Sequence, residues 1–328
     1  MEGFDKKFKD FPDYILKITY QIWEEKDVES IMQYYAEGIP VRFPDGIIYG
    51  PETVVKATYA TLKEFPDRQL LGEDVIWIGN DTEGYLSSHR ILSKATHSNS
   101  GVYGEATGKK LTYRVIADCA CKNNQVYDEW LVRDQGSIIR QLNLDPKTYA
   151  TQLIEHQGGL DNCPTPFNKN TDPDLKYTQI KLPDQNIGYE YADILKNIFS
   201  KNLDIIENCY DRAINQEQPG GFTGYGWQDV KTFWSSLLSA FPDASFKIEH
   251  VSFLNEPNEY AKAAVRWSLS GIHSGSGNFG EPSHADVYVM GISHAEFGPR
   301  GIKNEWVLFD ETSTVSYTHL RAHETVDY

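Results

Sequence analysis

The chain contains the same domain-length sequence twice. When residues 49–134 are placed over residues 225–310, a shift of 176, 21 of the 86 positions are identical without a gap. Ordinary residue frequencies would give about five identities. A period this long is a whole domain and not a solenoid repeat. The identical pairs include Tyr49/Tyr225, Phe65/Phe241, Pro66/Pro242, Asp67/Asp243, Arg90/Arg266, His97/His273, Glu129/Glu305, Trp130/Trp306 and Asp134/Asp310.

The repeat divides the 328 residues into two domains, as their number also allows. We expect domain 1 over residues 1–150 and domain 2 over residues 187–314. Residues 151–186 between them include stretches rich in Pro, Asn and Asp, which favour turns and extended chain. This segment is predicted to be a linker packed over the surface.

Each copy shows helical patterns first and strands afterwards. In the first copy, residues 14–23 and 28–35 are predicted as helical and 41–43 as a strand. A helix is expected from about Pro51 to Phe65, with its proline in the first turn where a missing N–H costs nothing. Strands are predicted over 75–77, 85–94, 111–120 and 126–132. This order is typical of an α+β fold.

The helical opening of the first copy contains residues 23–27 and Tyr34-Tyr35. The hairpin loop of residues 97–110 is matched by 273–282, and the last strand, residues 129–134, is matched by 305–310. In these three stretches the copies resemble the SnoaL-like polyketide cyclases, of the nuclear-transport-factor-2-like superfamily. The resemblance implies two cone-shaped domains, each a curved antiparallel sheet wrapped on N-terminal helices around an apolar pocket. Related domains pair through their sheets, so the two copies are expected to form an intramolecular pseudo-dimer.

The resemblance also implies catalytic positions. An Asp directly before a Trp on the last strand is the acid/base of the characterised cyclases, and Glu129 and Glu305 occupy that position. The extra methylene moves the carboxylate by about 1 Å, enough to change a rate where geometry is tight. An apolar pocket would raise the pKa of such a carboxyl group for proton removal beside a carbonyl. The alternative is a glutamate that only forms hydrogen bonds or faces solvent.

The preceding strand supplies a second pair of candidates. His294 matches a partner histidine of the family pattern, and the repeat places Asp118 at the same position in copy one. Glu305 with His294 would form an acid/base pair, and Glu129 with Asp118 a pair of carboxylates, so the copies are expected to differ in activity. A histidine in the core or on the surface is the alternative.

Three more pairs are candidates for substrate binding, each with a structural alternative. Trp130 and Trp306 are ligand platforms or core residues, on the strand face opposite Glu129. His97 and His273 open a Gly- and Ser-rich hairpin, at the pocket mouth or as loop-structuring residues. Arg90 and Arg266 lie in the middle of predicted strands. If they are buried they need a partner, and Glu73 and Glu249 are the expected acids.

Asp134 and Asp310 follow the last strand of each copy. With strand parity placing them away from Glu129, a helix N-cap suits Asp134, and a structural role is expected for both.

The sequence predicts a site without metal or cofactor. It has no Gly-x-Gly-x-x-Gly, Walker or Gly-x-Ser-x-Gly motif and no helical pair of histidines. Its four cysteines, Cys119, Cys121, Cys163 and Cys209, lack zinc spacing and are interpreted as structural thiols of a reducing compartment.

Charge and hydropathy limit the partners. A net charge of −16 argues against nucleic acid and anionic membrane surfaces. No run of 18 apolar residues and no secretory signal is present, so a cytoplasmic location is expected. We therefore expect a small apolar carbonyl compound as the substrate of a cofactor-free cyclase or isomerase. A non-catalytic ligand-binding or assembly module on the same fold is the alternative.

The last residues differ from the repeat. Residues 315–325 have the sequence that a transposase adapter used in sequencing libraries would give on translation. Residues 315–328 are therefore predicted to be read-through and not native, and His319 and His323 are left out of any site.

Overall fold

The two halves of the chain have the same order of elements in the computed structural model, which describes residues 1–156, 158–159, 167–168, 170–177, 179–316 and 318. The first half consists of α1 (Phe11–Trp23), the 3-10 turn η1 (Val28–Ser30), α2 (Ile31–Tyr34), β1 (Pro40–Phe43), β2 (Gly46–Tyr49), α3 (Pro51–Glu64), β3 (Gln69–Asn80), β4 (Gly84–Thr96), β5 (Lys110–Lys122), β6 (Gln125–Arg133), α4 (Gln135–Gln141) and α5 (Pro146–His156). The second half consists of α6 (Ile187–Phe199), α7 (Ile205–Cys209), β7 (Tyr210–Gln218), β8 (Phe222–Tyr225), α8 (Gly226–Ala240), β9 (Ser245–Leu254), β10 (Ala261–Ile272), β11 (Asp286–Gly298), β12 (Gly301–Phe309) and α9 (Glu311–Val315).

Each half forms one six-stranded sheet, and the two sheets have the same strand order. The orders are β2-β1-β6-β5-β4-β3 and β8-β7-β12-β11-β10-β9. The expectation that residues 49–134 and 225–310 share one α+β backbone is confirmed. The sheets differ from the expected purely antiparallel ones, because β1 pairs with β6 and β7 with β12 in parallel. A parallel neighbour needs a long connection, and most of each domain lies between these strands in sequence.

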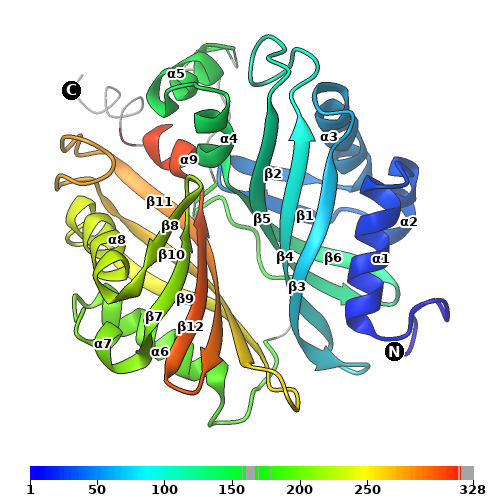
Figure 1. Ribbon diagram of the computed structural model, residues 1–328. Helices are drawn as coiled ribbons and strands as arrows, with labels where there is room; N and C mark the ends of the chain where they lie inside the picture. Colours follow the sequence, from blue (N-terminus) through cyan, green and yellow to red (C-terminus); the bar gives the residue numbers. More distant parts are fainter. Residues whose placement is uncertain (157, 160–166, 169, 178, 317, 319–328) are drawn as a thin grey trace.

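Amphipathic helices cover the outer face of each sheet (Figure 1). The first begins after Asp10, whose side chain accepts a hydrogen bond from the backbone N–H of Asp13. Its buried residues recur every three or four positions, as in a helix with one apolar stripe; they are Phe11, Tyr14, Ile15, Ile18 and Ile22. The helix α6 begins in the same way after Asn186, whose side chain accepts from Tyr189.

The opposite faces of the two sheets pack against each other in the middle of the molecule (Figure 1). Residues from both halves form one buried apolar cluster, Ile78, Leu86, Ile116, Ala120, Trp130, Val132, Met290, Ile292 and Leu308. Three residues that follow α5, Phe167, Tyr177 and Leu182, belong to the same cluster. The predicted surface linker thus places part of its length between the sheets, because its own apolar side chains gain from burial there.

The helix α5 joins the halves in a second way. It spans residue 150, the predicted end of domain 1, and its Ala150 belongs to the buried core of the second half.

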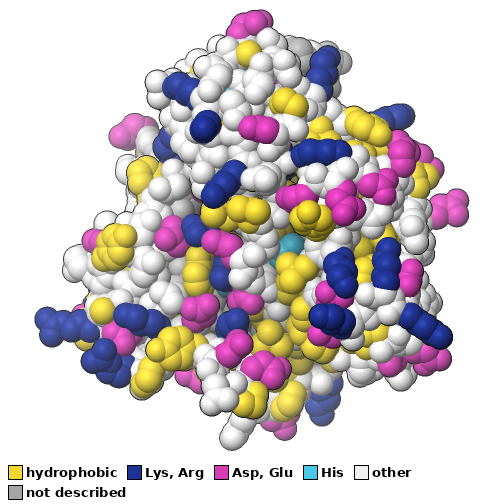
Figure 2. All heavy atoms as spheres, turned by 45° about the vertical axis from the view of Figure 1, so that its right-hand side comes forward, with side chains coloured by type: hydrophobic (Ala, Val, Ile, Leu, Met, Phe, Trp, Pro, Cys, Tyr) yellow, Lys and Arg dark blue, Asp and Glu magenta, His cyan; other side chains and the backbone are white. Residues whose placement is uncertain are grey.

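Lys, Arg, Asp and Glu side chains are interspersed on the face of the molecule in Figure 2. In the described part of the chain, no helix is long and apolar enough to cross a membrane.

The described part of the chain ends shortly after the short helix α9. Asp310 caps α9 by accepting from the backbone N–H of Thr312 at 2.8 Å. Of the predicted read-through segment, residues 317 and 319–328 lie outside the described residues. Cys163 also lies outside them.

Candidate active site

Alternation along the strands gives each sheet a pocket face and an interface face. On β6, Glu129, Leu131 and Arg133 point toward the helices, whereas Trp130 and Val132 point toward the other sheet. The register continues this division, since Glu129 pairs with Cys119 on β5 and Trp130 with Asp118. The predicted separation of Glu129 from Trp130 is confirmed.

A cavity of about 130 Å³ lies between the helices and the pocket face of the first half. On the same measure one water needs about 10–15 Å³, so the cavity has room for a small organic molecule. Its lining is mostly apolar and comes from α1, α3 and strands of the sheet. The apolar lining residues are Ile15, Ile18, Ile22, Trp23, Ile31, Val41, Phe43, Ile48, Val54, Ala57, Leu70, Ile91, Val115, Ala117, Val126 and Leu131.

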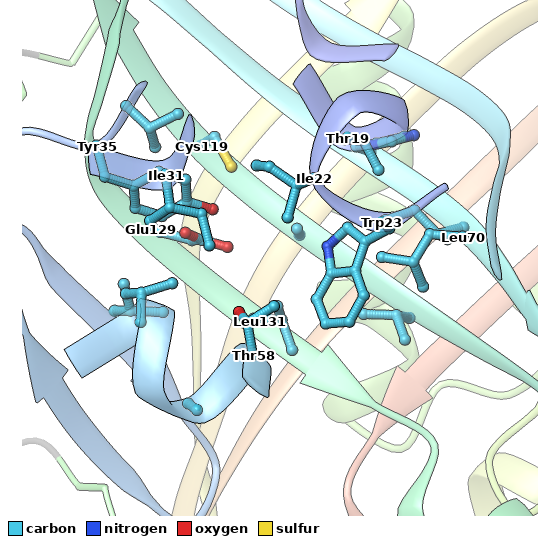
Figure 3. A pocket seen from close by; sticks show the side chains of 18 of the residues that line it. Thr19, Ile22, Trp23, Ile31, Tyr35, Thr58, Leu70, Cys119, Glu129 and Leu131 are labelled. Carbon is cyan, nitrogen blue, oxygen red and sulfur yellow. The ribbon is translucent and has the colours of Figure 1, made fainter. Parts of the chain in front are cut away.

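Glu129 is the acidic residue among those lining this cavity, and its side chain lies beside Tyr35 in Figure 3. It is 3% exposed, and burial raises the pKa of its carboxyl group to about 7, against the opposing effect of a hydrogen bond with Tyr35. Its Oε2 has no hydrogen-bond partner among the described residues. A carboxylate of this kind is partly ionised near neutral pH and has one oxygen free to accept a proton.

Two polar groups that line the same cavity as Glu129 were not predicted. Tyr35 follows α2 and forms the hydrogen bond just described. His89 lies on β4, opposite Ala117, and burial lowers the pKa of its imidazole to about 4, which keeps the ring neutral at pH 7. Its Nε2 is buried without a partner among the described residues. The parity that places Glu129 in the pocket could have identified His89 only if the strand register had been known.

Two arginines that were not predicted as site residues also line the cavity. Arg68 precedes β3 and Arg133 ends β6. A second cavity of about 430 Å³ adjoins the first, shares Leu131 and Arg133 with it, and is bounded by Asp45 and by Asp310 of the second half.

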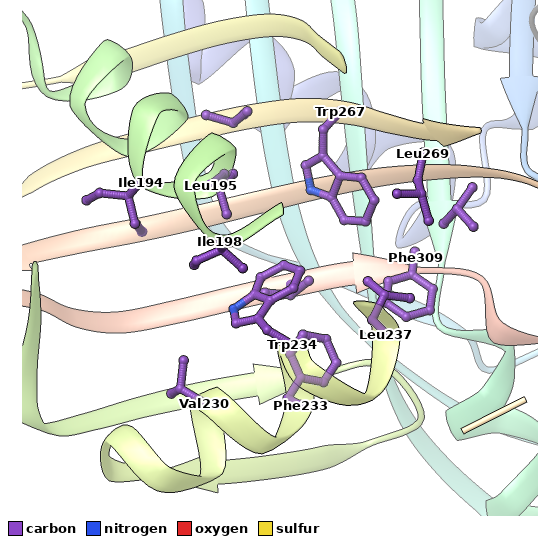
Figure 4. Packing of buried hydrophobic residues seen from close by; sticks show 14 of the residues in the cluster. Ile194, Leu195, Ile198, Val230, Phe233, Trp234, Leu237, Trp267, Leu269 and Phe309 are labelled. Atoms are coloured by element: carbon purple, nitrogen blue, oxygen red, sulfur yellow. The ribbon is translucent and has the colours of Figure 1, made fainter. Parts of the chain in front are cut away.

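In the second half, large side chains occupy the equivalent space (Figure 4). The repeat places Trp234 at the position of Thr58 and Trp267 at that of Ile91, and both indoles are fully buried. Trp267 lies against Gly291, where a Cβ would be 2.2 Å from the ring, and its Nε1 donates to Ser293 at 2.9 Å. Further substitutions of the same kind are Ala57 to Phe233, Thr61 to Leu237, Leu70 to Phe246 and Arg133 to Phe309.

Glu305 is buried in this filled half and is held by three donors. The hydroxyls of Tyr191 and Tyr210 donate to its Oε1 at 2.7 and 2.8 Å, and the amide of Gln216 donates to its Oε2 at 2.6 Å. Burial raises the pKa of this carboxyl group, and the three hydrogen bonds oppose that rise. Unlike Glu129, Glu305 has both oxygens engaged in hydrogen bonds.

The structure does not bring His294 beside Glu305. In the register of β11 with β12, Glu305 pairs with Ala295 and His294 with Trp306, so the two side chains lie on opposite faces of the sheet. His294 is instead at the interface, where its Nε2 is 2.7 Å from Ser88 Oγ of the first half and its Nδ1 is 3.1 Å from Arg90. Burial, together with the charge of Arg90, lowers the pKa of its imidazole.

Asp118 lies at the same interface and not beside Glu129. Its Oδ1 accepts from Ser88 at 2.5 Å, and its Oδ2 is 3.4 Å from Nε of Arg266. Burial raises the pKa of this carboxyl group, and Arg266 opposes the rise. The expectation that Glu305 pairs with His294 and Glu129 with Asp118 is wrong, because the strand registers place the two residues of each pair on opposite faces of the sheet.

The predicted substrate-binding arginines and tryptophans meet one another across the interface. Arg90 lies over the ring of Trp306 and Arg266 over that of Trp130, each 3.5 Å from the centroid. Arg90 also donates to Glu73 at 3.2 Å, as expected, but Arg266 bonds to the Tyr177 hydroxyl at 2.9 Å. The expected partner Glu249 accepts from Ser268 instead.

The remaining predicted residues have structural contacts. His97 bridges the hairpin to α3, with Nδ1 3.1 Å from Thr107 Oγ1 and Nε2 3.1 Å from Glu64 Oε1. His273 makes the equivalent contact with Ser283 Oγ at 3.1 Å. Asp134 caps α4 by accepting from Ser137, as predicted.

Asp134 also reaches the second half, where its carboxylate accepts from the backbone N–H groups of Gly220 and Gly221 at 2.8 and 3.1 Å.

No family model and no curated protein matches the chain. Among solved structures, the chain is similar to AclR from Streptomyces galilaeus, with 21% identity, coverage of 40% of this chain and 81% of that chain, and a TM-score of 0.35. It is similar to IdmH from Streptomyces antibioticus, with 18% identity, coverage of 40% and 98%, and a TM-score of 0.36. It is also similar to a SnoaL-like polyketide cyclase from Agrobacterium tumefaciens, with 14% identity, coverage of 40% and 96%, and a TM-score of 0.34. The chain resembles the SnoaL-like polyketide cyclases, as its motifs indicate.

Proposed function

We propose that the first half is a cofactor-free acid/base enzyme of the cyclase or isomerase type, with Glu129 as its proton-transferring group. The observation that carries this proposal is a buried carboxyl group, with a pKa of about 7 and one unpaired oxygen, in a mostly apolar cavity. Such a group is poised to act as a base near neutral pH.

The reaction begins with transfer of a proton from a carbon beside the substrate carbonyl to Glu129. The products of this step are the neutral carboxylic acid and an enolate. In an isomerisation the acid returns the proton to another carbon of the conjugated enolate. In a cyclisation the enolate carbon attacks a second carbonyl group of the substrate, its C=O π bond breaks to give an alkoxide, and the acid protonates that alkoxide. Because only a carboxylate and a carbonyl take part, we propose no metal or cofactor.

Two neighbours support Glu129 in this role. Tyr35 hydrogen-bonds to the carboxylate and orients it. The imidazole of His89 stays neutral, lines the same cavity, and has an Nε2 without a hydrogen-bond partner among the described residues. In the tautomer that carries the proton on Nε2, it donates to the carbonyl oxygen as negative charge develops there.

The second half is proposed to be a structural partner. Its equivalent space is occupied by Trp234 and Trp267, and both oxygens of Glu305 are already hydrogen-bonded. The reciprocal contacts of Arg90 with Trp306 and of Arg266 with Trp130 support an intramolecular pseudo-dimer. We also propose a cytoplasmic location, since the described cysteines Cys119, Cys121 and Cys209 are free thiols.

The test is exchange of the α-protons of 2-tetralone, a small apolar ketone, in D₂O, followed by NMR. The wild-type protein is expected to accelerate exchange by about 100-fold or more over buffer. Glu129→Gln should reduce the rate to that of buffer, whereas the matched variant Glu305→Gln should exchange like wild type. Equal rates for wild type and Glu129→Gln would contradict the proposal. Binding of 2-tetralone without exchange would favour the ligand-binding module.

A further inference from the structure

The cavity has a cationic end opposite its acid. Figure 3 places Glu129 and Tyr35 at one side of the pocket and Trp23 and Leu70 at the other. The guanidinium of Arg68 lies over the Trp23 ring, 4.5 Å from its centroid, so it marks this second side. Arg133 is on the same strand face as Glu129 and four residues further on, about 13 Å along β6 at ordinary strand rise.

These guanidinium groups are not neutralised by a close acid. Among the described residues, neither Arg68 nor Arg133 has a carboxylate within 4.0 Å, in contrast to Arg42, Arg90 and Arg114. A guanidinium group as buried as that of Arg68 ordinarily has such a partner, because burial of an uncompensated charge is costly.

The polar contacts of Arg68 are few. It is 2% exposed, and its Nε donates to Ser93 Oγ at 3.3 Å, while its Nη1 has no partner. The nearby acid Glu24 uses Oε1 to accept from the backbone N–H of Leu70 at 2.6 Å. Burial, with a contribution from the charge of Arg133, lowers the pKa of Arg68 to about 10, which leaves it charged at neutral pH.

Arg133 has a similar incomplete set of contacts. It forms a hydrogen bond with Tyr103 and interacts electrostatically with Asp45, but its Nε is buried without a hydrogen-bond partner among the described residues. It borders both the inner cavity and the adjoining one, so it stands where a ligand would pass from one to the other.

The repeat shows that the fold does not need arginine at either position. The residues of the second half that correspond to Arg68 and Arg133 are Ala244 and Phe309. At these two positions arginine is therefore present only in the half whose cavity is open, which points to a ligand and not to the scaffold.

We propose that the substrate carries a carboxylate, which Arg68 and Arg133 bind at the end of the cavity opposite Glu129. This inference rests on the proposed function for the identity of the pocket, and it specifies the substrate as an acid with an apolar body and a carbonyl group. The two guanidinium groups carry positive charge and donate hydrogen bonds, so they favour a carboxylate over a neutral group of the same shape.

The test compares trans-cinnamate with trans-cinnamamide, which have the same apolar body, by isothermal titration calorimetry on the full chain. Wild type is expected to bind the acid about tenfold or more tightly than the amide. Equal affinities, or no binding of cinnamate at millimolar concentration, would overturn the proposal. The comparison needs no variant, so it does not depend on any variant folding.

Variants then assign the preference to residues. Arg133→Met should remove most of it, and Arg133→Lys should restore part of it. Arg212→Met, at an exposed arginine of the second half, should leave cinnamate affinity unchanged. A preference that survives Arg133→Met and Arg68→Met would contradict the assignment. Loss of 2-tetralone exchange in Glu129→Gln and loss of acid selectivity in Arg133→Met are separate readouts, so the two proposals can fail independently.

Discussion

The guanidinium carbon of Arg90 lies 3.5 Å from the centroid of the Trp306 ring, across the boundary between the halves. Arg266 has the same relation to Trp130, and a shift of 176 residues converts one contact into the other. An interface in which residue i meets j and j meets i is the product of a two-fold arrangement. This reciprocity is the basis of the proposed pseudo-dimer, and it leads to the first prediction.

Arg90 and Trp306 should be energetically coupled. A double-mutant cycle with Arg90→Met and Trp306→Leu, measured by urea unfolding, is expected to give a coupling free energy of about 1–2 kcal/mol, because the stacked pair is desolvated. Arg90→Met combined with Trp227→Leu serves as control and should be additive within about 0.5 kcal/mol, because Trp227 lies on α8 and donates to the Tyr210 carbonyl of the second half. Additivity in both cycles would contradict the prediction.

The buried carboxyl group of Glu129 should make stability depend on pH. Its pKa is raised to about 7 in the folded chain from an ordinary value of 4.5. The folded state therefore holds the proton more tightly, and its stabilising contribution is lost as pH rises from about 4.5 through about 7. Relative to wild type, Glu129→Gln should become more stable over this range, by at most a few kcal/mol. Thermal unfolding of both proteins between pH 5 and 8 measures the difference, and parallel curves would refute it.

The same group should control the pH profile of proton transfer. The carboxylate form is the base, so 2-tetralone exchange is expected to rise from pH 5 and to level off above an apparent pKa of about 7. Glu305→Gln should show the same profile. A profile that is flat between pH 5 and 8 would mean that another group takes the proton.

The two halves should respond differently to changes at equivalent positions. Trp234 is fully buried in the filled core, and Trp234→Ala is expected to cost about 3–5 kcal/mol in the free energy of unfolding. Thr58 borders the open cavity, and Thr58→Ala should cost less than about 1 kcal/mol. Urea unfolding checks both. Similar losses would show that the cavity at Thr58 is closed in solution.

Much of the fold follows from periodicity and from the repeat. The helix at Pro51, the strand order common to both halves, the opposite faces of Glu129 and Trp130, and the cap at Asp134 all depend on local signals that the sequence carries. The parallel pairing of β1 with β6 could not be predicted in this way, because it joins segments nearly ninety residues apart.

The site was less predictable than the fold. His294 and Glu305 lie on neighbouring strands, and a one-residue difference in register decides whether they share a face. His89, Arg68 and Arg133 matter only because three separate segments converge on one cavity. The aligned repeat shows that Trp234 stands at the position of Thr58. The filling of the equivalent space in the second half could be inferred from this only by knowing that both side chains point into the space beneath the helices.

The tryptophans that fill the second half have a consequence for how the chain responds to its ligand. Because binding is proposed only for the cavity of the first half, a titration is expected to saturate at one equivalent per chain. Homotropic cooperativity requires at least two coupled sites, so a single chain should give a hyperbolic isotherm. The proposed pseudo-dimer would thus combine a two-fold architecture with a single binding site, without the communication that two identical sites would allow.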